Sequence, residues 1–82
     1  MKQAVLNLQG ANCAACVFAI EHLGRKVNGV SHIRVHAAEH KVYVRFSGDR
    51  NTLDALCAIV AKLGHSAAVD EQSIRDVPAD IS

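Results

Sequence analysis

The spacing of apolar residues changes repeatedly along this 82-residue chain, and that change limits the folds open to it. Apolar side chains recur at every second residue in a half-buried strand, but about every 3.6 residues on one face of a helix. Alternation predicts strands at 4–8, 30–36, 41–46 and 66–69, and helical spacing predicts helices at 16–27 and 51–63. The predicted order is therefore strand, helix, strand, strand, helix, strand.

This order is typical of two strand–helix–strand halves that share one antiparallel sheet. We expect an α+β fold, a ferredoxin-like βαββαβ sandwich with a four-stranded antiparallel sheet and two helices on one face. The chain direction would then bring three loops, 10–15, 37–40 and 64–66, to the same end of the sheet. Residues 1–71 are expected to form the domain. Residues 72–82 hold the only Pro and lack periodicity, which predicts a flexible acidic tail or linker.

The composition narrows the range of functions. Half of the residues are apolar but only 4% are aromatic, so the core must be built from aliphatic side chains. A large substrate pocket would consume much of so small an interior, and we expect no enzyme. The net charge of +1 combines +4 over residues 1–69 (eight basic, four acidic) with −3 over residues 70–82 (one basic, four acidic). The positive charge of residues 1–69 suits an acidic partner, but it is smaller than the positive charge expected of a nucleic-acid-binding domain.

Three cysteines, Cys13, Cys16 and Cys57, make a poor disulfide framework because the number is odd and two of them lie close together. Cys57 stands at helical spacing from Leu53 and Val60, which indicates a small apolar side chain at the edge of the core. No stretch is long enough for a signal peptide or a membrane span. We therefore expect a cytoplasmic domain with reduced thiols.

The Cys13-Ala14-Ala15-Cys16 segment lies at a predicted strand-to-helix junction. Two thiolates three residues apart at a helix start can point at one ion, and the positive end of the helix favours the thiolate form. Soft sulfur ligands select Cu(I) or Zn(II). Two sulfurs alone suit Cu(I), which accepts two-coordinate geometry, whereas structural Zn(II) requires four ligands and the chain has no second such motif.

Two segments, Gly10-Ala11-Asn12-Cys13-Ala14-Ala15-Cys16-Val17 and Leu63-Gly64-His65-Ser66-Ala67, resemble the heavy-metal-associated (HMA) domain. The resemblance covers about residues 3–70. It implies a metal held at the surface by Cys13 and Cys16, in a copper chaperone or an N-terminal module of a metal-transporting P-type ATPase. It also implies transfer by ligand exchange with such an ATPase or with a partner metal-binding domain. We expect a monomer in the metal-free form, with a metal-bridged dimer as a possible form of the metal-loaded protein.

Three positions depart from the family pattern. Ala11 replaces the family Met, and Asn12, in the supporting loop, replaces the common Thr. An Asp at position 12 accompanies Zn(II) or Cd(II) in relatives, so neutral Asn12 favours Cu(I). His65 stands where relatives often carry Tyr, Phe or Lys. It is expected at the correct end of the sheet to be a third ligand or a modulator, or else a surface imidazole.

Other interpretations stay open at this point. A Zn(II)- or Cd(II)-binding module of the same fold is one, and a thiol–disulfide redox domain that uses the cysteine pair is another. A third is an interaction domain whose cysteines are incidental. His32 and His36 share the exposed face of a predicted hairpin with Arg34, and His22 is expected to face solvent. A nucleic-acid role for that face is disfavoured, because Tyr43 is its only aromatic residue.

Overall fold

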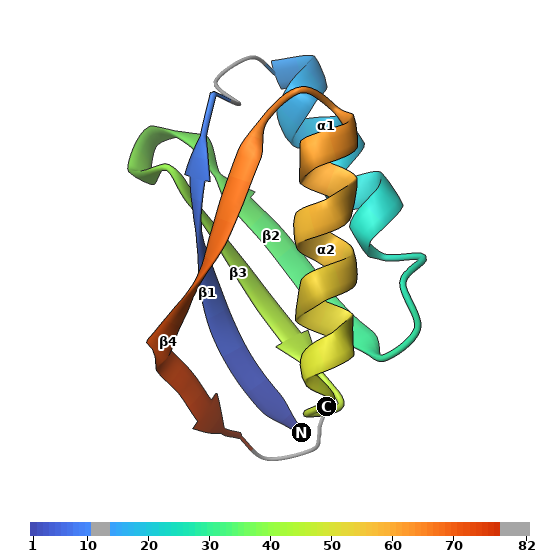
Figure 1. The fold of residues 1–82 in the computed structure, drawn as a ribbon, viewed down its shortest axis with the longest axis vertical. Helices are drawn as coiled ribbons and strands as arrows, with labels where there is room; N and C mark the ends of the chain where they lie inside the picture. The colour runs from blue at the N-terminus through green and yellow to red at the C-terminus, as the bar shows by residue number, and fades with distance from the viewer. Residues whose placement is uncertain (11–13, 78–82) are drawn as a thin grey trace.

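The structure is a computed structural model that describes residues 1–10 and 14–77. Its elements are, in order, β1 (Lys2–Gln9), α1 (Ala14–Gly24), β2 (Val30–His36), the 3-10 turn η1 (Ala37–Glu39), β3 (Lys41–Phe46), α2 (Arg50–Lys62) and β4 (Ser66–Asp76). The strands form one antiparallel sheet in the order β2-β3-β1-β4 (Figure 1). This arrangement confirms the predicted ferredoxin-like fold.

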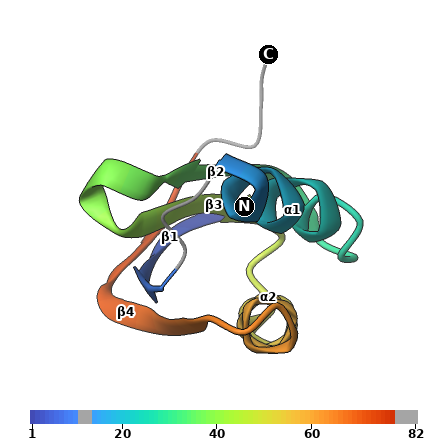
Figure 2. The ribbon, with the colours of Figure 1, turned by 90° about the horizontal axis from the view of Figure 1, so that it is seen from above.

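The sheet buries one face and leaves the other open to solvent (Figure 2). Alternate strand residues point toward the helices and are buried with Ile20 of α1 and Leu53, Leu56 and Val60 of α2. The strand members of this core are Ala4, Leu6, Leu8, Ile33, Val35, Val42, Val44 and Phe46. Period-two burial on one side of a sheet is what an amphipathic strand requires, so the predicted faces are confirmed.

Helix α1 approaches β2 closely at Gly24, which is buried. A Cβ atom at this position would lie 2.5 Å from Cδ1 of Ile33 and 3.2 Å from Cδ2 of Leu56. The expected helix through residue 27 is wrong at its end, because α1 stops at Gly24. Leu23, expected in the buried stripe, is 37% exposed. The missing side chain of Gly24 thus sets how closely this part of α1 packs on the sheet.

Strand β4 is longer than predicted. It does not end at Val69 but continues to Asp76, and Arg75 pairs with Gln3 of β1. The register shifts between these two ends of the strand. There the Ser73 hydroxyl accepts a hydrogen bond of 2.8 Å from the backbone N–H of Val5.

The irregular register explains the error in the sequence prediction, because it interrupts the alternation that identifies a strand. Residues 72–76 of the expected tail thus belong to the sheet. The remaining tail residues, 78–82, lie outside the described part of the chain.

The loops predicted to share one end of the sheet meet there, as far as the structure describes them. The backbone N–H of Leu8 donates a 2.8 Å hydrogen bond to the carbonyl of His40, directly after η1. Gln9, at the end of β1, pairs with Ser66 at the start of β4. The end of β1 is therefore flanked by the β2–β3 connection on one side and by the α2–β4 connection on the other.

We predict that Gly24→Ala lowers the free energy of unfolding by about 1–2 kcal/mol. Overpacking a core costs ~1–3 kcal/mol, and the better helix propensity of Ala returns at most about 1 kcal/mol. Ile33→Val removes the Cδ1 atom that the new methyl group would meet, so the double variant should lose less stability than the sum of the single variants. Urea unfolding of the four proteins measures this coupling, and additive losses would contradict the close approach.

Candidate metal-binding loop

Of the two cysteines predicted to hold a metal, the structure describes one. Cys16 lies in the first turn of α1, is half-buried, and packs against the core. Cys13, together with Ala11 and Asn12, lies outside the described residues. Backbone N–H groups in the first turn of a helix lack intrahelical acceptors, and the helix dipole is positive there. Cys16 is disulfide-bonded in this structure, which differs from the expectation of reduced thiols. Soft metals bind the thiolate, which this location favours, so the disulfide must be reduced before this cysteine can serve as a ligand.

His65 lies beside the start of the cysteine loop. A Cβ atom placed on Gly10 would come within 3.2 Å of Nδ1 of His65, so the imidazole stands against the last described residue before that loop. Gly10 has a φ of +90°, which glycine adopts readily and other residues rarely do. The His65 side chain is half-buried, and its backbone N–H donates to the carbonyl of Val60. The expected position of His65 is confirmed, whereas metal ligation by His65 stays a prediction.

Cys57 occupies a different environment. It is a free thiol, half-buried on α2 and packed against the core. Burial raises its pKa above the ordinary value, and the nearby carboxylate of Asp54 adds to that shift. A raised pKa keeps the thiol protonated at neutral pH and makes it a poor soft-metal ligand. Its packing agrees with the prediction of a structural cysteine.

The remaining histidines do not gather into a second metal site. Within residues 1–10 and 14–77, no group of three or more His, Cys, Asp or Glu side chains is placed to hold an ion. His32 and His36 are exposed on the open face of the sheet, as expected. His22 is exposed on α1, where its ring stacks on Phe18 at a centroid distance of 5.9 Å and an interplanar angle of 8°.

Phe18 is a residue that the sequence reasoning missed. Its side chain is 69% exposed, although it stands two residues after Cys16 on α1. The apolar stripe of the predicted helix passes through Val17 and Ile20, and Phe18 lies off it. That offset is the signal that could have identified it. A single exposed apolar side chain is ordinary on a protein surface, so Phe18 is a candidate contact residue only because it lies close in sequence to Cys16.

Comparison with known proteins places this arrangement among metal-handling domains. No family profile matches the chain. It is 29% identical over 68 residues to the copper chaperone CopZ of Bacillus subtilis, which covers 83% of this chain and 99% of CopZ. The solved N-terminal domain of PacS from Synechocystis PCC6803 is 33% identical, with a TM-score of 0.70 over 82% of this chain and 94% of that domain.

The small α+β fold described above is the architecture that this chain shares with the PacS domain. The chain belongs to the heavy-metal-associated domain family and is a metal-binding module. Two copper chaperones named CopZ, from Bacillus subtilis and Staphylococcus epidermidis, are matched over nearly their whole length, in agreement with the expectation that this domain is not an enzyme.

Other relatives leave the finer function open. The chain is 29% identical to a copper-exporting P-type ATPase of Staphylococcus aureus but spans only 8% of its length. It is equally similar to a mercuric transport protein periplasmic component of Shewanella putrefaciens. Within the described residues, no helix is long and apolar enough to cross a membrane. Family membership therefore establishes the class of protein, but not the metal, the partner or the compartment.

Proposed function

We propose that this domain binds Cu(I) through the thiolates of Cys13 and Cys16 and passes the ion to a partner by ligand exchange. The observation that carries the proposal is the position of Cys16 in the first turn of α1, at the end of the sheet where Gly10 meets His65. A metal bound at this end of the domain would lie where a partner's thiolates can approach it. An open coordination sphere of this kind suits transfer better than storage.

Cu(I) is favoured over divalent metals by the donor set. Two thiolates satisfy Cu(I), whereas Zn(II) usually requires four ligands. The chain has no second Cys-x-x-Cys motif to complete four sulfur ligands, and Asn12 adds no charged oxygen to the loop. Zn(II) or Cd(II) is the second candidate, because the relatives include a structure described as crosstalk between Cu(I) and Zn(II) homeostasis.

The partner would be a metal-transporting P-type ATPase or another metal-binding domain, since the chain resembles both chaperones and ATPase modules. We propose a cytoplasmic setting, where thiols stay reduced. The apo domain would be a monomer. Two loaded copies could share one ion through four cysteines, which gives a metal-bridged dimer.

Cu(I) titration under reducing conditions tests the cysteine site. We predict one tightly bound Cu(I) per domain and a loss of affinity of more than about 100-fold in Cys13→Ser or Cys16→Ser, since a first ligand should outweigh the ~10–100-fold effect of an outer contact. The matched control is Cys57→Ser, which should bind like the parent. Insulin reduction without tight metal binding would favour a redox domain instead. The absence of both activities would leave an interaction domain.

His65 is proposed as a third donor to the ion. We predict that His65→Phe weakens Cu(I) binding by about tenfold, in the range of lost secondary metal contacts. X-ray absorption of the loaded protein should also lose a nitrogen scatterer beside the two sulfurs. His32→Phe, which removes an imidazole from the open sheet face, is the control. Identical affinity and identical spectra for His65→Phe and the parent would exclude ligation.

Phe18 is proposed as a contact for the partner that receives the ion. Phe18 stands two residues after Cys16, about 3 Å along the helix axis, but on the solvent side of α1, so a partner that covers the exposed start of this helix would contact it. Phe18→Ser should slow transfer to the N-terminal domain of a copper-exporting ATPase by about tenfold, as expected of an aromatic interface anchor. Its Cu(I) affinity should match that of the parent. Ala58→Ser, exposed on α2, is the control, and equal transfer rates would contradict the proposal.

A further inference from the structure

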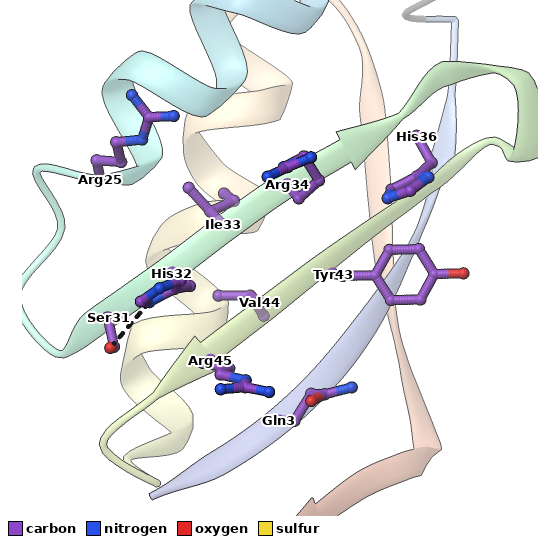
Figure 3. Close-up of a pocket in the computed structure, with 10 residues that line it drawn as sticks. All are labelled: Gln3, Arg25, Ser31, His32, Ile33, Arg34, His36, Tyr43, Val44 and Arg45. Atoms are coloured by element: carbon purple, nitrogen blue, oxygen red, sulfur yellow. Dashed lines mark hydrogen bonds between the residues drawn. The ribbon is translucent and has the colours of Figure 1, made fainter. Parts of the chain in front are cut away.

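We propose that the open face of the sheet is a binding site for a small polyanion that carries adjacent phosphate groups. This face lies opposite the helices and holds a hollow of about 660 Å³ (Figure 3). Its charged and aromatic lining comes from β2, β3 and the turn after α1: Arg25, His32, Arg34, His36, Tyr43 and Arg45. None of these residues belongs to the cysteine loop or to the Gly10–His65 contact.

The strand register gathers these side chains into rows. Arg45 of β3 pairs with His32 of β2 on one side and with Gln3 of β1 on the other. In the next row, Tyr43 pairs with Arg34. Paired residues point to the same side of a sheet, with Cβ atoms about 4.5–5.5 Å apart. The guanidinium groups of Arg34 and Arg45 therefore extend from neighbouring rows on the same face, as Figure 3 shows.

The three arginines of the hollow form no ion pair within the described part of the protein, although the carboxylate of Glu39 lies beside the hollow and accepts a hydrogen bond from the Tyr43 hydroxyl. No Asp or Glu is among the residues that line it. Within residues 1–10 and 14–77, the ion pairs involve only Lys2 and Arg50 as cations, so Arg25, Arg34 and Arg45 have no carboxylate partner there. Like charges placed on one sheet face disfavour the folded state. A bound anion would relieve this repulsion, so the arrangement is suited to a negatively charged ligand.

Phosphate is the anion that fits these donors best. A guanidinium presents a planar fork of N–H groups that matches two phosphate oxygens, and several such forks suit adjacent phosphates. Gln3 and Ser31, which also line the hollow, add an amide and a hydroxyl. The volume lies in the ~300–1,000 Å³ range of small-ligand sites.

A nucleic-acid strand is a poorer fit for this face. Sheets that bind single strands stack bases on two or three aromatic side chains, and Tyr43 is the aromatic residue of this one. Its ring already meets His36 edge-on at 4.8 Å, and its hydroxyl donates to Glu39 at 2.9 Å. An RNA ligand is therefore treated as an outcome of the test rather than as the proposal.

Titration of the metal-free full chain with pyrophosphate at low salt tests the site. We expect saturable binding, with NMR shift changes confined to β2, β3 and the neighbouring part of β1. Arg45→Gln should weaken binding by about tenfold, as expected for a charge-assisted contact. Arg45→Lys keeps the charge but loses the fork, and should fall between Arg45→Gln and the parent. Lys62→Gln, exposed on α2, removes the same charge elsewhere and should bind like the parent.

Thermal unfolding without ligand provides a second measurement. Arg45→Gln removes repulsion between like charges and no stabilising contact. Its unfolding temperature should therefore be higher than that of the parent at low salt, and no lower at high salt. Equal weakening in Lys62→Gln, or shift changes spread over the whole surface, would overturn the proposal. Tighter binding of an RNA oligonucleotide or an acidic peptide to the same face would also overturn it. ATP that binds at least as tightly as pyrophosphate would support it.

Discussion

Burial of a single face of the sheet beneath two helices is the constraint on which the rest of this domain depends. The aliphatic side chains of alternate strand residues, such as Leu6, Val44 and Phe46, form the core with those of α1 and α2. Burying these side chains provides most of the favourable free energy available to so short a chain. The ends of the strands and the outer sheet face take no part in this core. Both places hold residues that we propose to bind a ligand.

Much of this could be predicted from the sequence, because hydrophobic periodicity reports burial directly. The alternation of Val42, Val44 and Phe46 identified the face that packs on the helices. Topology then placed His65 at the same end as the cysteine loop, and the contact with Gly10 confirms that placement. Local pattern and chain connectivity sufficed here because the contacts follow from the order of the elements alone.

The sequence failed where tertiary packing overrides local pattern. In the sequence, Gly24 indicates only a position that weakens a helix. In the structure, its missing side chain lets α1 approach Ile33, and this contact between distant segments cannot be seen in the local sequence. The second half of β4 was missed because its irregular register replaces alternation with a hydrogen bond from the Val5 amide to Ser73. Phe18 was overlooked although its place off the apolar stripe is visible in the sequence, and the structure adds that its side chain is largely exposed.

The course of β4 also changes how the charges of the chain are distributed. Asp76 lies 3.4 Å from Lys2, and Glu71 pairs with Arg50, so acidic residues of the last segment are held against cations at one end of the domain. These exposed pairs contribute little to stability, about 0–1 kcal/mol each. These pairs instead affect where the charge lies, because the cations that they neutralise are away from the hollow. Arg34 and Arg45 take no part in these pairs, and they line the hollow on the open sheet face together with Arg25.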